Sequence, residues 1–148
     1  GVDLEEYNAP QPAEPTVDAP EFERSLQILL AEDNAGNIDT IVQFLSFRGH
    51  EVLVATNGVD AVELAVRNEP DIIIMDMQMP IVDGLEATRQ LRTNEKMQTT
   101  PVIALTGLAM PGDKEGCLAA GANAYMSKPI SLRMLDSLIQ ELVTNRLD

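Results

Sequence analysis

Residues 72–80 read Ile-Ile-Ile-Met-Asp-Met-Gln-Met-Pro, an unbroken apolar run that ends on a lone carboxylate, Asp76. Such a run predicts a strand that is buried on both faces, which is typical of a central strand in a parallel sheet. Aspartate is depleted in strands, and a buried ionised carboxylate is costly unless partners compensate its charge. The position of Asp76 therefore predicts partners that come from elsewhere in the chain.

On either side of this run, short apolar segments alternate with segments of helical period, which indicates repeated βα units around a parallel sheet. Strands are expected at 27–31, 51–55, 71–75, 101–105 and 124–126. Helices are expected at 36–47, 58–67, 84–94 and 112–120, and an apolar stripe over 132–143 marks the last one. Asn34 is placed to cap the first helix and Gly49 to end it, while Pro111 and Gly121 bracket the fourth.

The composition indicates one folded domain with an acidic surface. The chain has 148 residues, of which 45% are hydrophobic, so it can bury a sizeable core. A net charge of −14 opposes binding to nucleic acid or anionic lipid, and no apolar stretch is long enough to cross a membrane. The single Cys117 and single His50 can form neither an internal disulfide nor a zinc site of the usual kind. We expect a cytoplasmic protein whose partners are proteins or cations.

The N-terminal segment has a different composition from the rest. Up to Glu23 it contains acidic residues and no Lys or Arg, with prolines at positions 10, 12, 15 and 20. Such a segment has too little apolar surface to offset the entropy of ordering it. We therefore assign residues 1–24 as an extended linker and residues 25–148 as the folded domain. The first residue is Gly1 rather than methionine, which we interpret as a sign of a longer parent protein.

Chemically reactive side chains follow the predicted strands, at the edge where parallel α/β sheets bind ligands. They are Glu32 and Asp33, Asp76, Thr106, and Lys128. Clustered carboxylates repel one another unless a cation lies between them, and Mg²⁺ prefers oxygen ligands together with phosphate oxygens. A lysine and a hydroxyl opposite that cation would face a phosphoryl group, and a carboxylate can accept it as nucleophile. The sequence thus predicts a Mg²⁺ site, with Mn²⁺ as a possible substitute, at which Asp76 is phosphorylated.

Together these segments resemble the landmarks of a response-regulator receiver domain. The matching segments are Glu32-Asp33, Met75 to Pro80 with Asp83-Gly84, Ala104 to Thr106, and Lys128-Pro129. The resemblance spans residues 26–145 and implies a flavodoxin-like (βα)5 fold, a three-layer sandwich whose five-stranded parallel sheet has the order 2-1-3-4-5. It also implies that a histidine kinase or histidine phosphotransfer domain passes phosphate to Asp76. A downstream protein would then recognise the surface of the fourth helix, fifth strand and fifth helix.

The resemblance also implies roles for individual residues. Mg²⁺ would be bound by Asp33, Asp76 and the backbone carbonyl of Gln78, with Glu32 assisting. Backbone amides of Met77 and Gly107 would hold phosphoryl oxygens. Thr106 and Tyr125 would form the switch pair, and the Lys128–Pro129 peptide bond would be cis.

The run from Met75 to Pro80, followed by Asp-Gly-Leu-Glu-Ala-Thr-Arg, resembles receivers fused to hybrid sensor kinases more than receivers with DNA-binding output. The parent protein is then expected to be a histidine kinase, while catalysis by this chain is limited to its own phosphorylation and dephosphorylation. Two positions depart from the family pattern. Gly107 stands where alanine is more common, and Leu108 stands where a polar residue is frequent. Because an apolar Leu108 hinders an attacking water, we predict slow autodephosphorylation.

Simpler interpretations exist for single residues: Asp33 or Asp76 as a helix cap, Lys128 as a solvated lysine, and Tyr125 as half-buried packing. Aspartyl phosphatases are a rival class, but they carry a second aspartate where this chain has Gln78. A flavin-binding module is another, but the strand ends here are acidic and lack a phosphate-binding loop. A docking module of the same fold that does not accept phosphate remains the alternative function.

Overall fold

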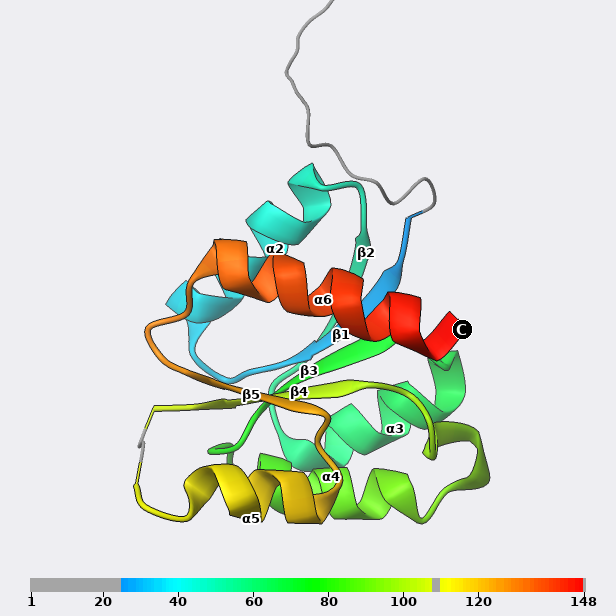
Figure 1. Ribbon diagram of the computed structural model, residues 1–148, viewed down its shortest axis with the longest axis vertical. Coiled ribbons are helices and arrows are strands. Elements are labelled where there is room, and N and C mark those ends of the chain that lie inside the picture. Colours follow the sequence, from blue (N-terminus) through cyan, green and yellow to red (C-terminus); the bar gives the residue numbers. More distant parts are fainter. Residues whose placement is uncertain (1–24, 108–109, 148) are drawn as a thin grey trace, which may run out of the picture.

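The chain alternates strands and helices around a single sheet in the computed structural model, which describes residues 25–107 and 110–147 (Figure 1). The predicted linker, residues 1–24, and Leu108 with its predicted effect on dephosphorylation lie outside the described residues. The strands are β1 (Gln27–Ala31), β2 (Glu51–Ala55), β3 (Ile72–Asp76), β4 (Val102–Thr106) and β5 (Ala124–Ser127). The helices are α2 (Ala35–Phe47), α3 (Gly58–Asn68), α4 (Gly84–Arg92), the short 3₁₀ helix η1 (Glu95–Met97), α5 (Asp113–Ala120) and α6 (Leu132–Leu147).

The five strands are parallel and lie in the order β2-β1-β3-β4-β5, which confirms the expected flavodoxin-like fold. The register brings the strand ends to one edge of the sheet. Ala31 pairs with Met75, and Asp76 pairs with Leu105 on the other side of β3. The residues that follow β1 and the last residue of β3 are therefore neighbours.

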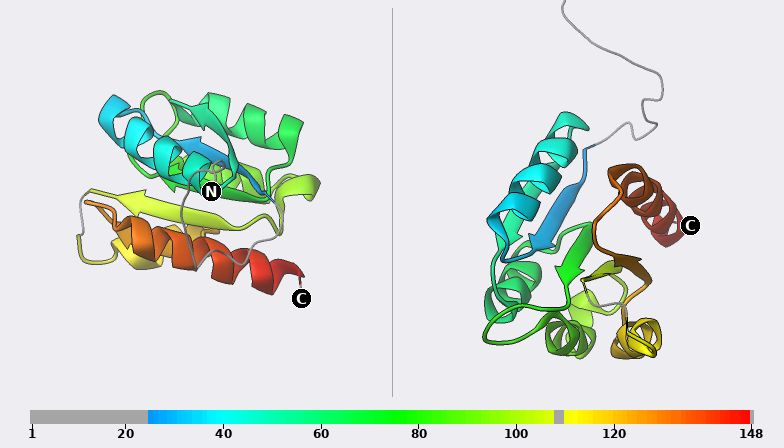
Figure 2. Two further views of the ribbon diagram at one scale, coloured as in Figure 1. Left: turned by 90° about the horizontal axis from the view of Figure 1, so that it is seen from above. Right: turned by 90° about the vertical axis from the view of Figure 1, so that its left-hand side faces the viewer.

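Helices cover both faces of the sheet, and the central strands contribute apolar side chains alternately to each face. Ile72 and Ile74 pack with α2 and α6, whereas Ile73 and Met75 pack with α3, α4 and α5. Figure 2 shows α4 and α5 side by side on the second of these faces. Every residue of β3 is buried, as the apolar run predicts. Among the described residues, no helix has the length and apolar character that crossing a membrane requires.

Most predicted boundaries agree with the structure to within one residue, but α4 ends earlier than expected and α6 continues past the apolar stripe at 132–143 to Leu147. Strands β3 and β4 each lie one residue later than expected, so Asp76 and Thr106 are the last residues of their strands. Helix α4 ends two residues early, because the side chain of Asn94 accepts a hydrogen bond from the Lys96 N–H and starts η1. Asn34 caps α2 as predicted, and Gly49 follows that helix at a φ of +93°.

Candidate functional site

Three carboxylates meet at the carboxyl edge of the sheet. Oxygen atoms of Glu32, Asp33 and Asp76 all lie within 4.8 Å of one another. The side chains of Glu32 and Asp76 are buried, whereas Asp33 is exposed to solvent. Glu32 and Asp33 follow β1, and Asp76 ends the adjacent strand β3, so the parallel register brings the three predicted acids together.

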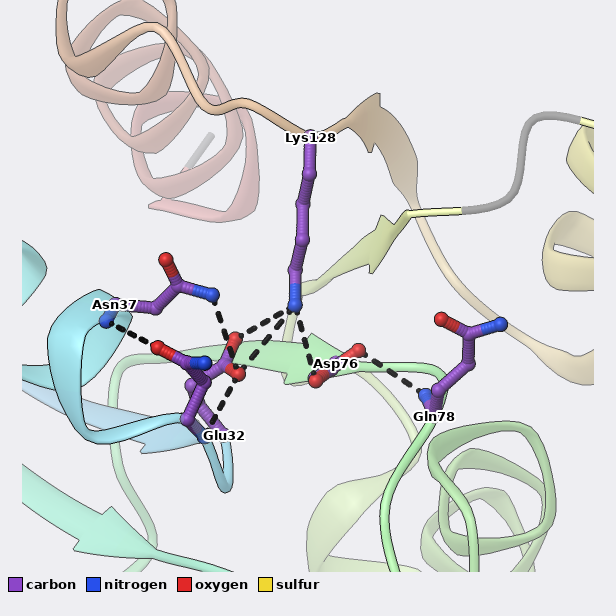
Figure 3. A network of polar contacts seen from close by, with 6 residues as sticks. Glu32, Asn37, Asp76, Gln78 and Lys128 are labelled. Carbon is purple, nitrogen blue, oxygen red and sulfur yellow. Dashed lines mark hydrogen bonds and ion pairs between the residues drawn. The ribbon is translucent and has the colours of Figure 1, made fainter.

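Lys128, which directly follows β5, contacts two of these acids, Glu32 and Asp76 (Figure 3). Its Nζ lies 3.1 Å from Asp76 Oδ2 and 3.1 Å from Glu32 Oε1. Its backbone is joined to the end of β4, because the Lys128 N–H donates to the carbonyl of Thr106 at 2.7 Å. The Lys128–Pro129 peptide bond is cis. The position of Lys128 thus makes it part of the site rather than a solvated surface lysine.

Burial and neighbouring charges shift the pKa values of both Asp76 and Lys128. Burial raises the pKa of Asp76; the Gln78 N–H opposes that effect, the charge of Glu32 adds to it, and Lys128 opposes it, so that the pKa is raised overall. For Lys128, burial alone would lower the pKa, but the bonds to Glu32 and Asp76 outweigh it and raise the pKa. The lysine therefore stays charged and acts as a fixed positive charge beside Asp76.

The backbone after Asp76 presents one amide to its carboxylate. The Gln78 N–H donates to Asp76 Oδ1 at 3.0 Å. The Met77 N–H instead donates to the carbonyl of Leu105 at 2.8 Å and so extends the ladder between β3 and β4. This corrects the expectation for Met77, because its amide is already used in the sheet and the N–H that faces Asp76 is that of Gln78.

Gly84 lets helix α4 begin directly beside the carboxyl end of β3. A Cβ at this position would lie 2.0 Å from the carbonyl oxygen of Asp76, which no side chain tolerates. The neighbouring Asp83 caps α4 by accepting a hydrogen bond from the Glu86 N–H at 2.9 Å. The Asp83-Gly84 pair therefore holds the β3–α4 loop tightly around Asp76.

Two asparagines that the sequence analysis did not assign to the site hold the carboxylate of Glu32. The Asn34 N–H donates to Glu32 Oε2 at 3.1 Å, and Asn37 Nδ2 lies 3.5 Å from the same oxygen. Asn34 was predicted only as a helix cap. The available signal was Asn37 in the first turn after the acids, whereas the donor from Asn34 is a backbone N–H that every residue except proline carries.

Thr106 and Tyr125, the predicted switch pair, lie on β4 and β5. The buried Thr106 lines a cavity of about 240 Å³, together with Gln78, Leu85 and Cys117. Tyr125 is half-buried and packs against the core on the face covered by α3, α4 and α5.

The donor set suits a hard divalent cation. All three acidic groups offer oxygen atoms, which Mg²⁺ prefers, and exposed Asp33 leaves room for the waters that this ion retains. Glu32 Oε1 is buried and, among the described residues, receives the ion pair with Lys128 but no hydrogen bond. The residues present therefore fit the ion that the sequence predicts.

The sequence model of the response regulator receiver domain matches residues 28–140. The chain belongs to the response regulator receiver family. The polar-differentiation response regulator DivK of Brucella anthropi is 40% identical over 105 residues, which cover 71% of this chain and 85% of DivK.

Solved receiver structures agree with this assignment. The receiver domain of sensor histidine kinase PA1611 from Pseudomonas aeruginosa, solved with a magnesium ion in its active-site cleft, is 39% identical with a TM-score of 0.77, covering 82% of this chain and 99% of that domain. The Saccharomyces cerevisiae receiver domain of Ssk1, solved with the histidine phosphotransfer protein Ypd1, is 30% identical with a TM-score of 0.75, covering 81% of this chain and 90% of the other. This receiver thus has relatives that bind magnesium and a phosphotransfer protein.

Proposed function

We propose that this receiver takes a phosphoryl group from a phosphohistidine onto Asp76 in a Mg²⁺-dependent reaction. The observation that carries the proposal is the Asp76 carboxylate at the end of β3, beside two further acids and 3.1 Å from the Lys128 ammonium. A nucleophilic carboxylate, a cation site and a fixed positive charge are the parts that phosphoryl transfer to an aspartate requires.

In this proposal Asp33, Asp76 and the Gln78 carbonyl would hold the metal, and Glu32 would assist. When bound, Mg²⁺ would supply positive charge that offsets the negative charge of the carboxylates and of the phosphoryl oxygens. An Asp76 oxygen forms the new O–P bond as the N–P bond of the phosphohistidine breaks, and the bonding electrons return to the imidazole nitrogen. Lys128 and the Thr106 hydroxyl stabilise charge on the phosphoryl oxygens, with the backbone amides of Gln78 and Gly107.

The phosphoryl donor is a histidine kinase or histidine phosphotransfer domain, and the parent protein is a hybrid kinase. Support comes from the relative in a Pseudomonas aeruginosa sensor histidine kinase and from the yeast receiver solved with Ypd1. Phosphorylation would bias a two-state surface formed by α5, β5 and α6, with Thr106 and Tyr125 as its switch residues. That surface would then bind a downstream protein.

The proposal is tested by the intact mass of the protein after incubation with acetyl phosphate and Mg²⁺. We expect a gain of one phosphoryl group in the wild-type protein. The gain should be lost in the Asp76→Asn variant and in the presence of EDTA. Mg²⁺ binding without any phosphoryl gain would contradict the proposal and favour a docking module that does not accept phosphate.

A further inference from the structure

Asn37 lies in the first turn of α2, and its side-chain amide faces the site rather than the helix. Nδ2 lies 3.5 Å from Glu32 Oε2 (Figure 3). Asn37 and Lys128 also line one cavity of about 220 Å³ beside the site. The amide is thus directed at the carboxylate that Lys128 also contacts.

The amide of Asn37 does not cap the helix. Asn37 is the third residue of α2, a position whose side chain in a capping box bonds back to the N–H of the cap residue. Here that N–H, which belongs to Asn34, donates to Glu32 instead. Only the backbone N–H of Asn37 takes part in capping, by donating to Asn34 Oδ1 at 2.9 Å. The side chain of Asn37 is therefore available to act on Glu32.

Glu32 needs these donors because its side chain is fully buried. In the structure its Oε2 receives the Asn34 N–H, the Asn37 amide and Lys128 Nζ, the last at 3.3 Å. The proposed function requires Lys128 to turn from Glu32 toward a phosphoryl group on Asp76. Once it does so, the Asn34 N–H and the Asn37 amide are the protein donors that remain on the buried Glu32 Oε2.

We propose that Asn37 is a positioning residue of the phosphoacceptor site, one that holds the Glu32 carboxylate so that Lys128 can leave it. The inference rests on the proposed function. Without the amide, Glu32 holds Lys128 more tightly. An ammonium fixed among the carboxylates competes with a divalent cation for them, and it moves less readily to the phosphoryl group. Both metal binding and phosphorylation should therefore weaken.

The test compares Asn37→Leu with the wild-type protein, since leucine has similar size and a good helix propensity. Mg²⁺ affinity is measured without any phosphoryl donor, from backbone amide shifts in an NMR titration. We expect the dissociation constant to rise about three- to tenfold, as the loss of one long charge-assisted hydrogen bond implies. The rate of phosphorylation by acetyl phosphate at saturating Mg²⁺ should fall, and Asn37→Gln, which keeps the amide, should restore part of both.

Asn68→Leu is the matched control, because Asn68 Nδ2 bonds the Leu64 carbonyl at 3.0 Å at the far end of α3. It should leave Mg²⁺ affinity unchanged, and the urea midpoints of both leucine variants should stay close to that of the wild type. If the wild type binds Mg²⁺ and is phosphorylated while Asn37→Leu matches it within twofold, the role of Asn37 is overturned and the proposed function stands. If the wild type does neither, the proposed function fails and the inference fails with it.

Discussion

At the residue scale, one lysine compensates two buried carboxylates. Lys128 is the side chain that lies 3.1 Å from both Glu32 and Asp76, and these two acids are almost completely buried. Removing one partner from such a group leaves uncompensated buried charge, which costs more than the pair itself contributes. The structure of the site without metal therefore depends on this lysine.

We predict that Lys128→Met lowers the free energy of unfolding by about 2 kcal/mol, because it leaves Glu32 and Asp76 unpaired. Mg²⁺ should recover more stability in the variant than in the wild type, since the cation then meets no competing ammonium. Urea unfolding with and without Mg²⁺ measures both effects. Lys96→Met is the control, because the ion pair of Lys96 with Glu69 is exposed and 3.7 Å long, and it should change stability by less than about 1 kcal/mol.

A second residue-scale prediction concerns Gly84. Gly84→Ala places a Cβ against the Asp76 carbonyl, so we expect it to cost at least about 2 kcal/mol of unfolding free energy and to slow phosphorylation. Gly116→Ala, in the middle of α5 with open space around its Cβ, should instead stabilise by up to about 1 kcal/mol. Equal effects of the two substitutions in urea unfolding would contradict the close approach at Gly84.

The sequence was informative about the site wherever a residue broke a local pattern. Asp76 interrupts an apolar strand, and Lys128 follows a short strand just before a proline, so both stood out. Asn37 did not, because a polar residue in the first turn of a helix is ordinary. The bond between the Met77 N–H and the Leu105 carbonyl was also hidden, since it depends on where the pairing of β3 and β4 ends.

At the element scale, Arg92 joins the end of α4 to two loops. Its guanidinium donates to the carbonyls of Met97, Thr100 and Gly121 and to Asn123 Oδ1. Asn123 Oδ1 also accepts the Val102 N–H that begins β4. One side chain therefore fixes the segments that lead into β4 and β5.

We predict that Arg92→Met destabilises the protein by about 3 kcal/mol, because several buried carbonyls lose a charged donor. Arg89→Met, three residues earlier on the same helix, removes an ion pair with Glu86 whose side chains are 55% and 50% exposed, and it should cost less than about 1 kcal/mol. Thermal and urea unfolding of the two variants test the difference. Similar losses in both would refute the linking role of Arg92.

Strand positions could be predicted because each buried strand coincides with an apolar run of its own. The end of α4 could not. The pattern of residues 84–94 continues a helix, but Arg92 bonds to carbonyls that are up to 29 residues away in the chain. Contacts of that separation leave no periodic signal in the sequence. The start of η1 instead depends on a local contact, in which the Lys96 N–H donates to Asn94 Oδ1, but an asparagine at that position does not by itself break the helical pattern.

At the scale of the whole molecule, ionisable groups at the two ends of the sheet respond to pH in opposite directions. At the amino end, His50 Nδ1 accepts the Leu26 N–H at 3.2 Å, which requires an unprotonated Nδ1. Burial has the largest effect on the pKa of His50 and lowers it. Asp136 and Asp71 raise the pKa and Arg48 lowers it, so that the pKa is lowered overall. At the carboxyl end, the pKa of Asp76 is raised, so its burial costs less as pH falls.

For His50 the unfolded chain binds the proton more readily than the folded protein. Its contribution to stability is therefore complete above the ordinary histidine pKa of about 6.5 and is lost as the pH falls below that value. We predict that the wild type loses more unfolding free energy between pH 7.5 and pH 5.5 than His50→Asn does, because the asparagine carbonyl can accept the Leu26 N–H without titrating. Parallel pH profiles of the two proteins would contradict this account.

The most direct test of the central claim is to locate the phosphorylated residue. The protein is incubated with acetyl phosphate and Mg²⁺ and then treated with borohydride, which reduces an aspartyl phosphate to homoserine. Peptide mass spectrometry then identifies the converted position. Our account predicts homoserine at position 76, and none when Mg²⁺ is withheld. Conversion at Asp33 instead, or at no aspartate in a protein that binds Mg²⁺, would contradict the assignment of Asp76 as the phosphoacceptor.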